Sequence, residues 1–107
     1  MENISHSFLV NEAVKHGVNK AIILQHIRYW LTQNRTNNKN IREDYVWTYI
    51  SSASVVQVFP YFKQSTVRRW LVELEEDGIL RSAKYNKKNY DNTKWYTIPK
   101  EFCLSPL

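Results

Sequence analysis

The sequence predicts an α+β fold that is mainly helical and carries a small antiparallel sheet. Between residues 65 and 77, apolar residues recur every three or four positions, as they do on one face of a helix. Residues 79–85 and 93–98 are rich in aromatic and β-branched side chains and flank a polar segment, which is typical of a β-hairpin. With 107 residues, of which 43% are hydrophobic, the chain is long enough for one domain with a single core.

The first third of the chain is expected to form two helices joined by a tight turn. The first helix covers residues 8–16 and ends at Gly17. The second helix covers residues 20–33 and has Asn19 as its N-cap. Because the apolar surface of the second helix is wider than one stripe, this helix must contact more than one neighbour.

The wide apolar surface has two interpretations. In the simpler one, the helix at 20–33 is the central core helix of the domain. In the other, its part near Tyr29 and Trp30 meets a second copy of the chain, and the first two helices form a homodimer. The sequence leaves both open.

The middle of the chain alternates between loop, strand and helix. Residues 34–44 are mostly polar and charged and are expected to form an exposed loop, whose cations are either solvated or a second basic contact surface. Residues 45–49 predict a short strand that joins the hairpin in a three-stranded sheet. Ser51 or Ser52 then caps a helix at 52–59, which ends before a proline.

The helix at 65–77 has signals at both ends. Ser65, or Gln64 just before it, stands where an N-cap is expected, and Gly78 is expected to adopt the left-handed conformation of a Schellman ending. In the strand at 93–98, side chains alternate between two faces, and the pattern does not decide which of its large rings faces inward. The order helix, helix, strand, helix, helix, strand, strand predicts a winged helix-turn-helix.

Composition narrows the classes of partner and location. The chain has 15 Lys and Arg against 10 Asp and Glu, and this excess of +5 suits a polyanion or an acidic protein surface. Cys103 is the only cysteine, so no internal disulfide can form, and a reducing, cytoplasmic location is expected. Neither a signal segment nor a long apolar run is present in the sequence, so we expect no contact with a membrane.

No constellation of residues predicts an enzyme or a cofactor site. His6, His16 and His26 are ten residues apart, whereas the ligands of a helical zinc pair are three or four residues apart, so no metal site is expected. Two glycines, at 17 and 78, cannot form a glycine-rich phosphate loop. Ser, His and Asp residues are scattered without a nucleophile motif. We therefore expect a protein that binds without catalysis and without a cofactor.

Two charged runs bear on binding. The hairpin holds five cations and one carboxylate between Arg81 and Lys94, which favours contact with a nucleic-acid backbone, although an ordinary soluble hairpin is the simpler interpretation. The helix at 65–77 carries four carboxylates in its last turns, where the helix dipole disfavours them. They form either a solvated face or a feature that repels phosphate and directs the basic N-terminal half of the helix toward DNA.

Several segments share features with one known family, namely aromatic strands, a helix that leads into a wing, and a lysine-rich hairpin tip. They are Tyr45-Val46-Trp47-Thr48-Tyr49, Phe59-Pro60-Tyr61-Phe62, Ser65-Thr66-Val67-Arg68-Arg69-Trp70-Leu71, Leu74-Glu75-Glu76-Asp77-Gly78-Ile79-Leu80, Tyr85-Asn86-Lys87-Lys88 and Asp91-Asn92-Thr93-Lys94-Trp95-Tyr96-Thr97-Ile98. Together with the helix from Asn19 to Trp30, they resemble the N-terminal winged-helix domain of phage replication proteins, the replisome organisers and DnaD-like initiators. In that family the domain binds an origin or oligomerises, and a further C-terminal part contacts a helicase or its loader; this sequence stops before such a part.

The resemblance implies a winged helix of phage or prophage replication initiation that binds double-stranded DNA, with replication proteins as further partners. A transcriptional regulator of the same fold and a protein-interaction module that never contacts DNA are the alternatives. The helix would enter the major groove, and the wing would contact the DNA backbone or the minor groove. The expected DNA contacts are Lys63, Gln64, Ser65, Thr66, Arg68, Arg69, Lys84, Tyr85, Lys87 and Lys88.

Overall fold

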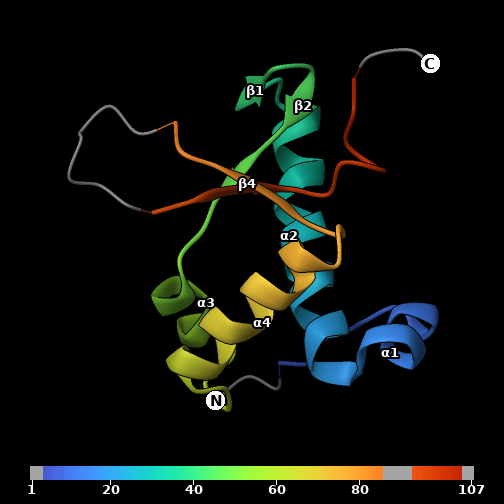
Figure 1. The fold of residues 1–107 in the computed structure, drawn as a ribbon, viewed down its shortest axis with the longest axis vertical. Coiled ribbons are helices and arrows are strands. Elements are labelled where there is room, and N and C mark those ends of the chain that lie inside the picture. Colours follow the sequence, from blue (N-terminus) through green and yellow to red (C-terminus); the bar gives the residue numbers. More distant parts are fainter. Residues whose placement is uncertain (1–3, 86–92, 105–107) are drawn as a thin grey trace.

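The computed structural model describes residues 4–85 and 93–104, and these residues form a compact α+β fold (Figure 1). Within them, the four helices are α1 (Val10–His16), α2 (Val18–Thr36), α3 (Ser52–Val58) and α4 (Gln64–Glu76). The strands are β1 (Ile41–Arg42), β2 (Tyr45–Val46), β3 (Thr48–Tyr49), β4 (Arg81–Ala83) and β5 (Trp95–Thr97). The predicted α+β class, with helices and a small antiparallel sheet, is therefore confirmed.

The strands belong to two antiparallel sheets. Three of them pair in the order β3-β5-β4, with Thr48 and Ser82 both opposite Tyr96. The prediction that a strand preceding the third helix joins the hairpin is therefore confirmed. The other two, β1 and β2, form a separate two-stranded sheet (Figure 1).

The core is organised around α2, the long helix that the strands cross in Figure 1. Tyr96 is the ring of β5 that faces inward, with 6% of its surface exposed, whereas Trp95 is half-buried. The core cluster combines residues of α2, β2, α3, α4 and β5 with residues of the segments that adjoin them, and none of its members lies in α1, β1, β3 or β4: Ile23, Leu24, Ile27, Leu31, Val46, Ile50, Val55, Phe59, Val67, Leu71, Leu74, Leu80, Tyr96, Ile98 and Phe102. Within the described ranges, no helix is long and apolar enough to span a bilayer.

Two helix ends have the caps that the sequence predicts. Gly78 has φ +77°, its N–H donates to the Glu75 carbonyl, and the Ile79 N–H donates to the Leu74 carbonyl, which is the predicted Schellman ending. Ser51 is the N-cap of α3, and its side chain and that of Ser54 each accept from the other's backbone N–H. Both predictions are confirmed.

Two predicted N-caps are wrong. Gly17, with φ +93°, caps the end of α1 and the start of α2, so Asn19 already lies inside the helix. Lys63 precedes α4 without a side-chain cap, and Gln64 and Ser65 are its first helical residues. The physical reason in the first case is that glycine alone readily adopts the positive φ required for so sharp a turn.

The segment at 34–44 is not all loop, contrary to the prediction. Helix α2 continues to Thr36, and Ile41–Arg42 forms β1, which pairs with β2. The turn between these strands is Glu43-Asp44, whose φ values of +53° and +67° are those of a tight hairpin turn. Such turns usually carry Asn or Gly, so the acidic pair conceals the hairpin in the sequence.

The predicted strand at 45–49 is split in two. The Val46 N–H donates to the Phe102 carbonyl, and Tyr45 bridges to Cys103, so β2 lies beside the C-terminal segment. After Trp47 the chain changes partner, and β3 pairs with β5. The helix predicted at 8–16 begins only at Val10, and none of its residues is buried.

Candidate nucleic-acid interface

Helix α4 has a buried face and an exposed face. Its apolar residues Val67, Leu71 and Leu74 are buried in the core, while Trp70 is half-buried. Residues three and four positions apart share one side of a helix, and on the opposite side the structure exposes the polar and basic positions. The exposed residues of α4 are Gln64, Ser65, Arg68, Arg69 and Glu76, together with the apolar Val72.

The exposed side of α4 is basic because no carboxylate neutralises it. Residues 60–72 contain Lys63, Arg68 and Arg69 and no Asp or Glu. All three cations are exposed, and within the described residues none of them forms an ion pair. We call Lys63, Arg68 and Arg69 the α4 basic surface.

The carboxylates in the last turns of α4 are held by the body of the protein. Glu73 pairs with Lys20 of α2 at 3.0 Å. Glu75 accepts a hydrogen bond from the Ser82 hydroxyl and lies 3.8 Å from the ammonium of Lys94. The side chains of Glu73 and Glu75 remain 40% and 33% exposed, so these carboxylates are both solvated and paired, and phosphate repulsion by the run stays a prediction.

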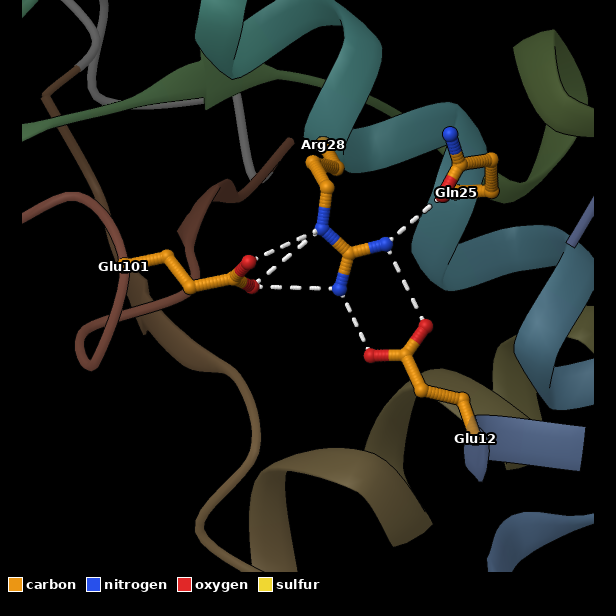
Figure 2. Close-up of polar contacts among 4 residues, drawn as sticks. All are labelled: Glu12, Gln25, Arg28 and Glu101. Carbon is orange, nitrogen blue, oxygen red and sulfur yellow. Dashed lines mark hydrogen bonds and ion pairs between the residues drawn. The ribbon is translucent and has the colours of Figure 1, made fainter. Parts of the chain in front are cut away.

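Arg28 shows the opposite arrangement to the α4 basic surface (Figure 2). Its guanidinium bridges Glu12 of α1, at 2.6 Å, and Glu101 of the C-terminal segment, at 3.1 Å, and it also donates to the Gln25 carboxamide. Burial alone would lower the pKa of Arg28, but hydrogen bonds with Glu12 and Glu101 outweigh it and raise the pKa. The Arg28 guanidinium is therefore occupied by contacts within the protein.

Three further arginines lie against aromatic rings. The guanidinium carbon of Arg35 is 4.8 Å from the centre of the Phe102 ring, and that of Arg81 is 4.8 Å from the Tyr45 ring. The guanidinium carbon of Arg42 is 5.8 Å from the Tyr85 ring. Such contacts fix the cations on the protein surface. Of the three cations at 34–44, Arg35 and Arg42 therefore pack on rings, whereas Lys39 is exposed, and a second basic contact surface there stays a prediction.

The wing residues divide into exposed and internal positions. Lys84, just after β4, is exposed. Tyr85 instead donates its hydroxyl to Glu43 at 2.7 Å, and its ring centre lies 5.2 Å from that of Trp47. Burial, and then the bond with Glu43, raise the pKa of Tyr85 to about 12. The other two predicted wing contacts, at 87 and 88, lie outside the described residues.

The first residues of α4 also differ in their contacts. The Gln64 carboxamide donates to the Ser52 hydroxyl at 3.3 Å and thereby links α4 to α3. Ser65 is exposed and Thr66 is half-buried. The structure thus brings Lys63, Ser65, Arg68 and Arg69 together as exposed positions, whereas Gln64 also has an internal partner.

No sequence pattern predicts the contact that the N-terminal segment makes with the connection between α3 and α4. His6 shares a 2.7 Å hydrogen bond with the Tyr61 hydroxyl, and its ring centre lies 4.5 Å from that of Phe59. His26 packs on the same Phe59 ring at 5.1 Å, so two histidines twenty residues apart in the sequence share one aromatic neighbour. Across residues 4–85 and 93–104, no three His, Cys, Asp or Glu side chains are grouped to hold a metal ion.

Comparisons with protein families, curated proteins and solved structures give no match for this chain. Its function is therefore inferred from its residues and their geometry.

Proposed function

We propose that this chain is a winged helix-turn-helix protein that binds double-stranded DNA and performs no chemistry. The order of elements supports this assignment. Helices α3 and α4 follow each other after a short connection, α4 leads into the hairpin β4-β5, and β3, just before α3, pairs with β5. In this interpretation α4 is the recognition helix and the hairpin is the wing.

The α4 basic surface is the observation that carries the proposal. An α-helix fits the major groove, where an arginine can donate two hydrogen bonds to a guanine edge. Arg68 and Arg69 are free to do so because they have no carboxylate partner among the described residues. Since adjacent helical residues point about 100° apart, one of them reads a base and the other contacts phosphate, and we favour Arg68 for the base.

The acidic end of α4 supports the same orientation. Glu73 and Glu75 are neutralised by Lys20 and Lys94, which belong to α2 and to the segment before β5. The helix therefore has one end that is tied to the protein and one end that offers uncompensated positive charge. A polyanion would meet α4 at its N-terminal half.

A role in phage-type replication initiation is proposed from the sequence resemblance alone. Transcriptional regulation by the same DNA-binding surface is the alternative within this fold. Selection of bound fragments from random and phage DNA separates the two roles. Enrichment of an origin repeat supports replication, and enrichment of an operator beside the chain's own promoter supports regulation.

A protein-interaction module is a second candidate because of α1. Val10 and Val14 are 73% and 84% exposed, and no residue of α1 is buried, so this helix presents apolar side chains to a partner. The homodimer proposed through the first two helices belongs to this candidate. Light scattering at high protein concentration tests it, and a strictly monomeric mass would exclude the homodimer.

The decisive test of DNA binding compares two charge deletions. Fluorescence anisotropy with a labelled random duplex is measured for the native protein, for the double variant Arg68→Ala-Arg69→Ala, and for Lys100→Ala as a control at an exposed cation outside α4. We expect the double variant to bind at least about tenfold more weakly and the control to bind as the native protein does. Equal weakening by both, or no salt-sensitive binding at all, would favour the interaction module.

A further inference from the structure

A cavity of about 430 Å³ lies where α2, β3 and α3 meet, and no residue of α4 lines it. Its volume is in the range of small-molecule sites in proteins, roughly 300–1,000 Å³. Its walls come from these three elements and from Asn40 and Ile50 in the segments beside them. The lining combines aromatic rings, carboxamides and hydroxyl groups.

Two large rings line this cavity and remain exposed. Trp30 of α2 is 45% exposed and Tyr49 of β3 is 47% exposed. The Trp30 ring is held in place by edge contacts with the rings of Tyr29, at 5.3 Å, and His26, at 6.5 Å. Positioned aromatic faces of this kind are platforms on which flat rings stack.

Three carboxamides line the same cavity: Asn34, Asn40 and Gln57. Asn34 donates from its amide nitrogen to the Trp47 carbonyl at 2.8 Å, which fixes the group and leaves its oxygen as an acceptor. Within the described residues, the side chains of Asn40 and Gln57 have no hydrogen-bond partner. A carboxamide offers a donor and an acceptor side by side, which matches the edge of a nucleobase.

The cavity carries no formal charge from its lining, which includes no Lys, Arg, Asp or Glu. Burial, and then the nearby His6, lower the pKa of His26, so this ring is uncharged at neutral pH. An ionised ligand would find no counter-charge here. The ligand that fits this lining is therefore uncharged, flat and rich in hydrogen-bonding groups.

We propose that this cavity binds a nucleobase, stacked on Trp30 or Tyr49 and hydrogen-bonded by Gln57 and its neighbouring carboxamides. The base belongs either to a free nucleoside or to an unpaired position in a nucleic-acid strand. This inference goes beyond the proposed function, because it uses none of the residues of the α4 basic surface. Either can fail while the other stands.

The test titrates isotope-labelled protein with four probes: adenosine, cytidine, a single-stranded oligonucleotide and an abasic strand of the same length. NMR follows the indole N–H of Trp30 and the side-chain amide of Gln57. Trp30→Ala should weaken binding of the base about fivefold or more, and Gln57→Ala, at an exposed position on α3, about two- to tenfold. Phe8→Ala, at an exposed ring that does not line the cavity, serves as the control and should leave binding unchanged.

The probes distinguish the sources of the base. Shifts with the nucleosides assign a free nucleoside, and shifts with the strand alone, lost with the abasic strand, assign an unpaired base. Either result supports the proposal when Trp30→Ala and Gln57→Ala weaken it. The proposal is overturned if no probe moves these signals at millimolar concentration, if the abasic strand binds equally well, or if neither variant weakens binding.

Discussion

Arg28 and Arg68 are both helical arginines, yet their surroundings are opposite. Arg28 lies half-buried between Glu12 and Glu101 and joins α1, α2 and the C-terminal segment. Arg68 is exposed on α4, and no carboxylate lies in residues 60–72. The comparison teaches that the net charge of the chain does not identify a binding surface. The positions of the carboxylates decide which cations stabilise the fold and which are available to a partner.

The largest expected effect is on stability, from removal of Arg28. Arg28→Ala should lower the free energy of unfolding by about 2–3 kcal/mol, between the values for exposed and for fully buried ion pairs, because it leaves the largely buried Glu12 without its partner. Urea denaturation measures the loss, with Lys15→Ala as an exposed control. DNA affinity of the folded variant should stay unchanged. A variant of native stability with weakened DNA binding would reverse the roles that we assign to the two arginines.

The next effect is on DNA binding, from removal of Arg68. Arg68→Ala should cost about 1–3 kcal/mol of affinity for a preferred sequence and leave stability within about 0.5 kcal/mol. Arg68→Lys sharpens the test, because lysine keeps the charge but cannot form the two parallel hydrogen bonds. Anisotropy on a preferred duplex and a random duplex should show that Arg68→Lys retains general binding and loses preference. Full retention of preference would show that Arg68 contacts phosphate only.

A smaller effect on stability is expected at the acidic end of α4. Glu75→Ala removes the contacts to Ser82 and Lys94 and should destabilise the protein by about 1–2 kcal/mol. Glu76→Ala, one residue further and exposed, is the matched control and should change stability little. The same two variants test phosphate repulsion. If both strengthen DNA binding equally, the acidic run acts on DNA by its charge and not through its contacts.

The smallest effect concerns Tyr85. Because its hydroxyl donates to Glu43, Tyr85→Phe should change DNA affinity by less than about twofold. The pKa of Tyr85 is raised to about 12, so the hydroxyl stabilises the folded state below pH 10 and this contribution is lost as the pH rises through about 12. Burial also raises the pKa of Tyr61 and Tyr96, so absorbance titration at alkaline pH should show one late-ionising tyrosine fewer in the variant than in the native protein. A loss of DNA affinity would place the hydroxyl in the interface.

The sequence predicted the parts of the fold that depend on local signals. The Schellman ending at Gly78, the N-cap at Ser51 and the apolar face of α4 all follow from residues a few positions apart. The hairpin turn at Glu43-Asp44 could not be predicted, because Glu at positive φ is unusual, Asp in such turns usually precedes Gly, and the turn is stabilised by β1-β2 pairing. The cap at Asn19 was wrong because Gly17 serves both helices.

The candidate site was predictable only where it depends on residues that are close together in the sequence. Helical periodicity identified Arg68 and Arg69 as exposed positions. Contacts between residues far apart in the chain have no local signal, and three of them changed the account: Lys20 with Glu73, Arg28 with Glu101, and Tyr85 with Glu43. The nucleobase cavity was not foreseen for the same reason, since its lining comes from α2, β3 and α3.

The most direct test of the account is the salt dependence of DNA binding. Each phosphate contact that is lost lowers the slope of log affinity against log salt by about 0.9. The double variant Arg68→Ala-Arg69→Ala should therefore have a slope about 1–2 lower than the native protein, and Lys100→Ala should have the native slope. A double variant with the native slope would contradict the claim that unpaired cations on α4 form the surface that meets DNA.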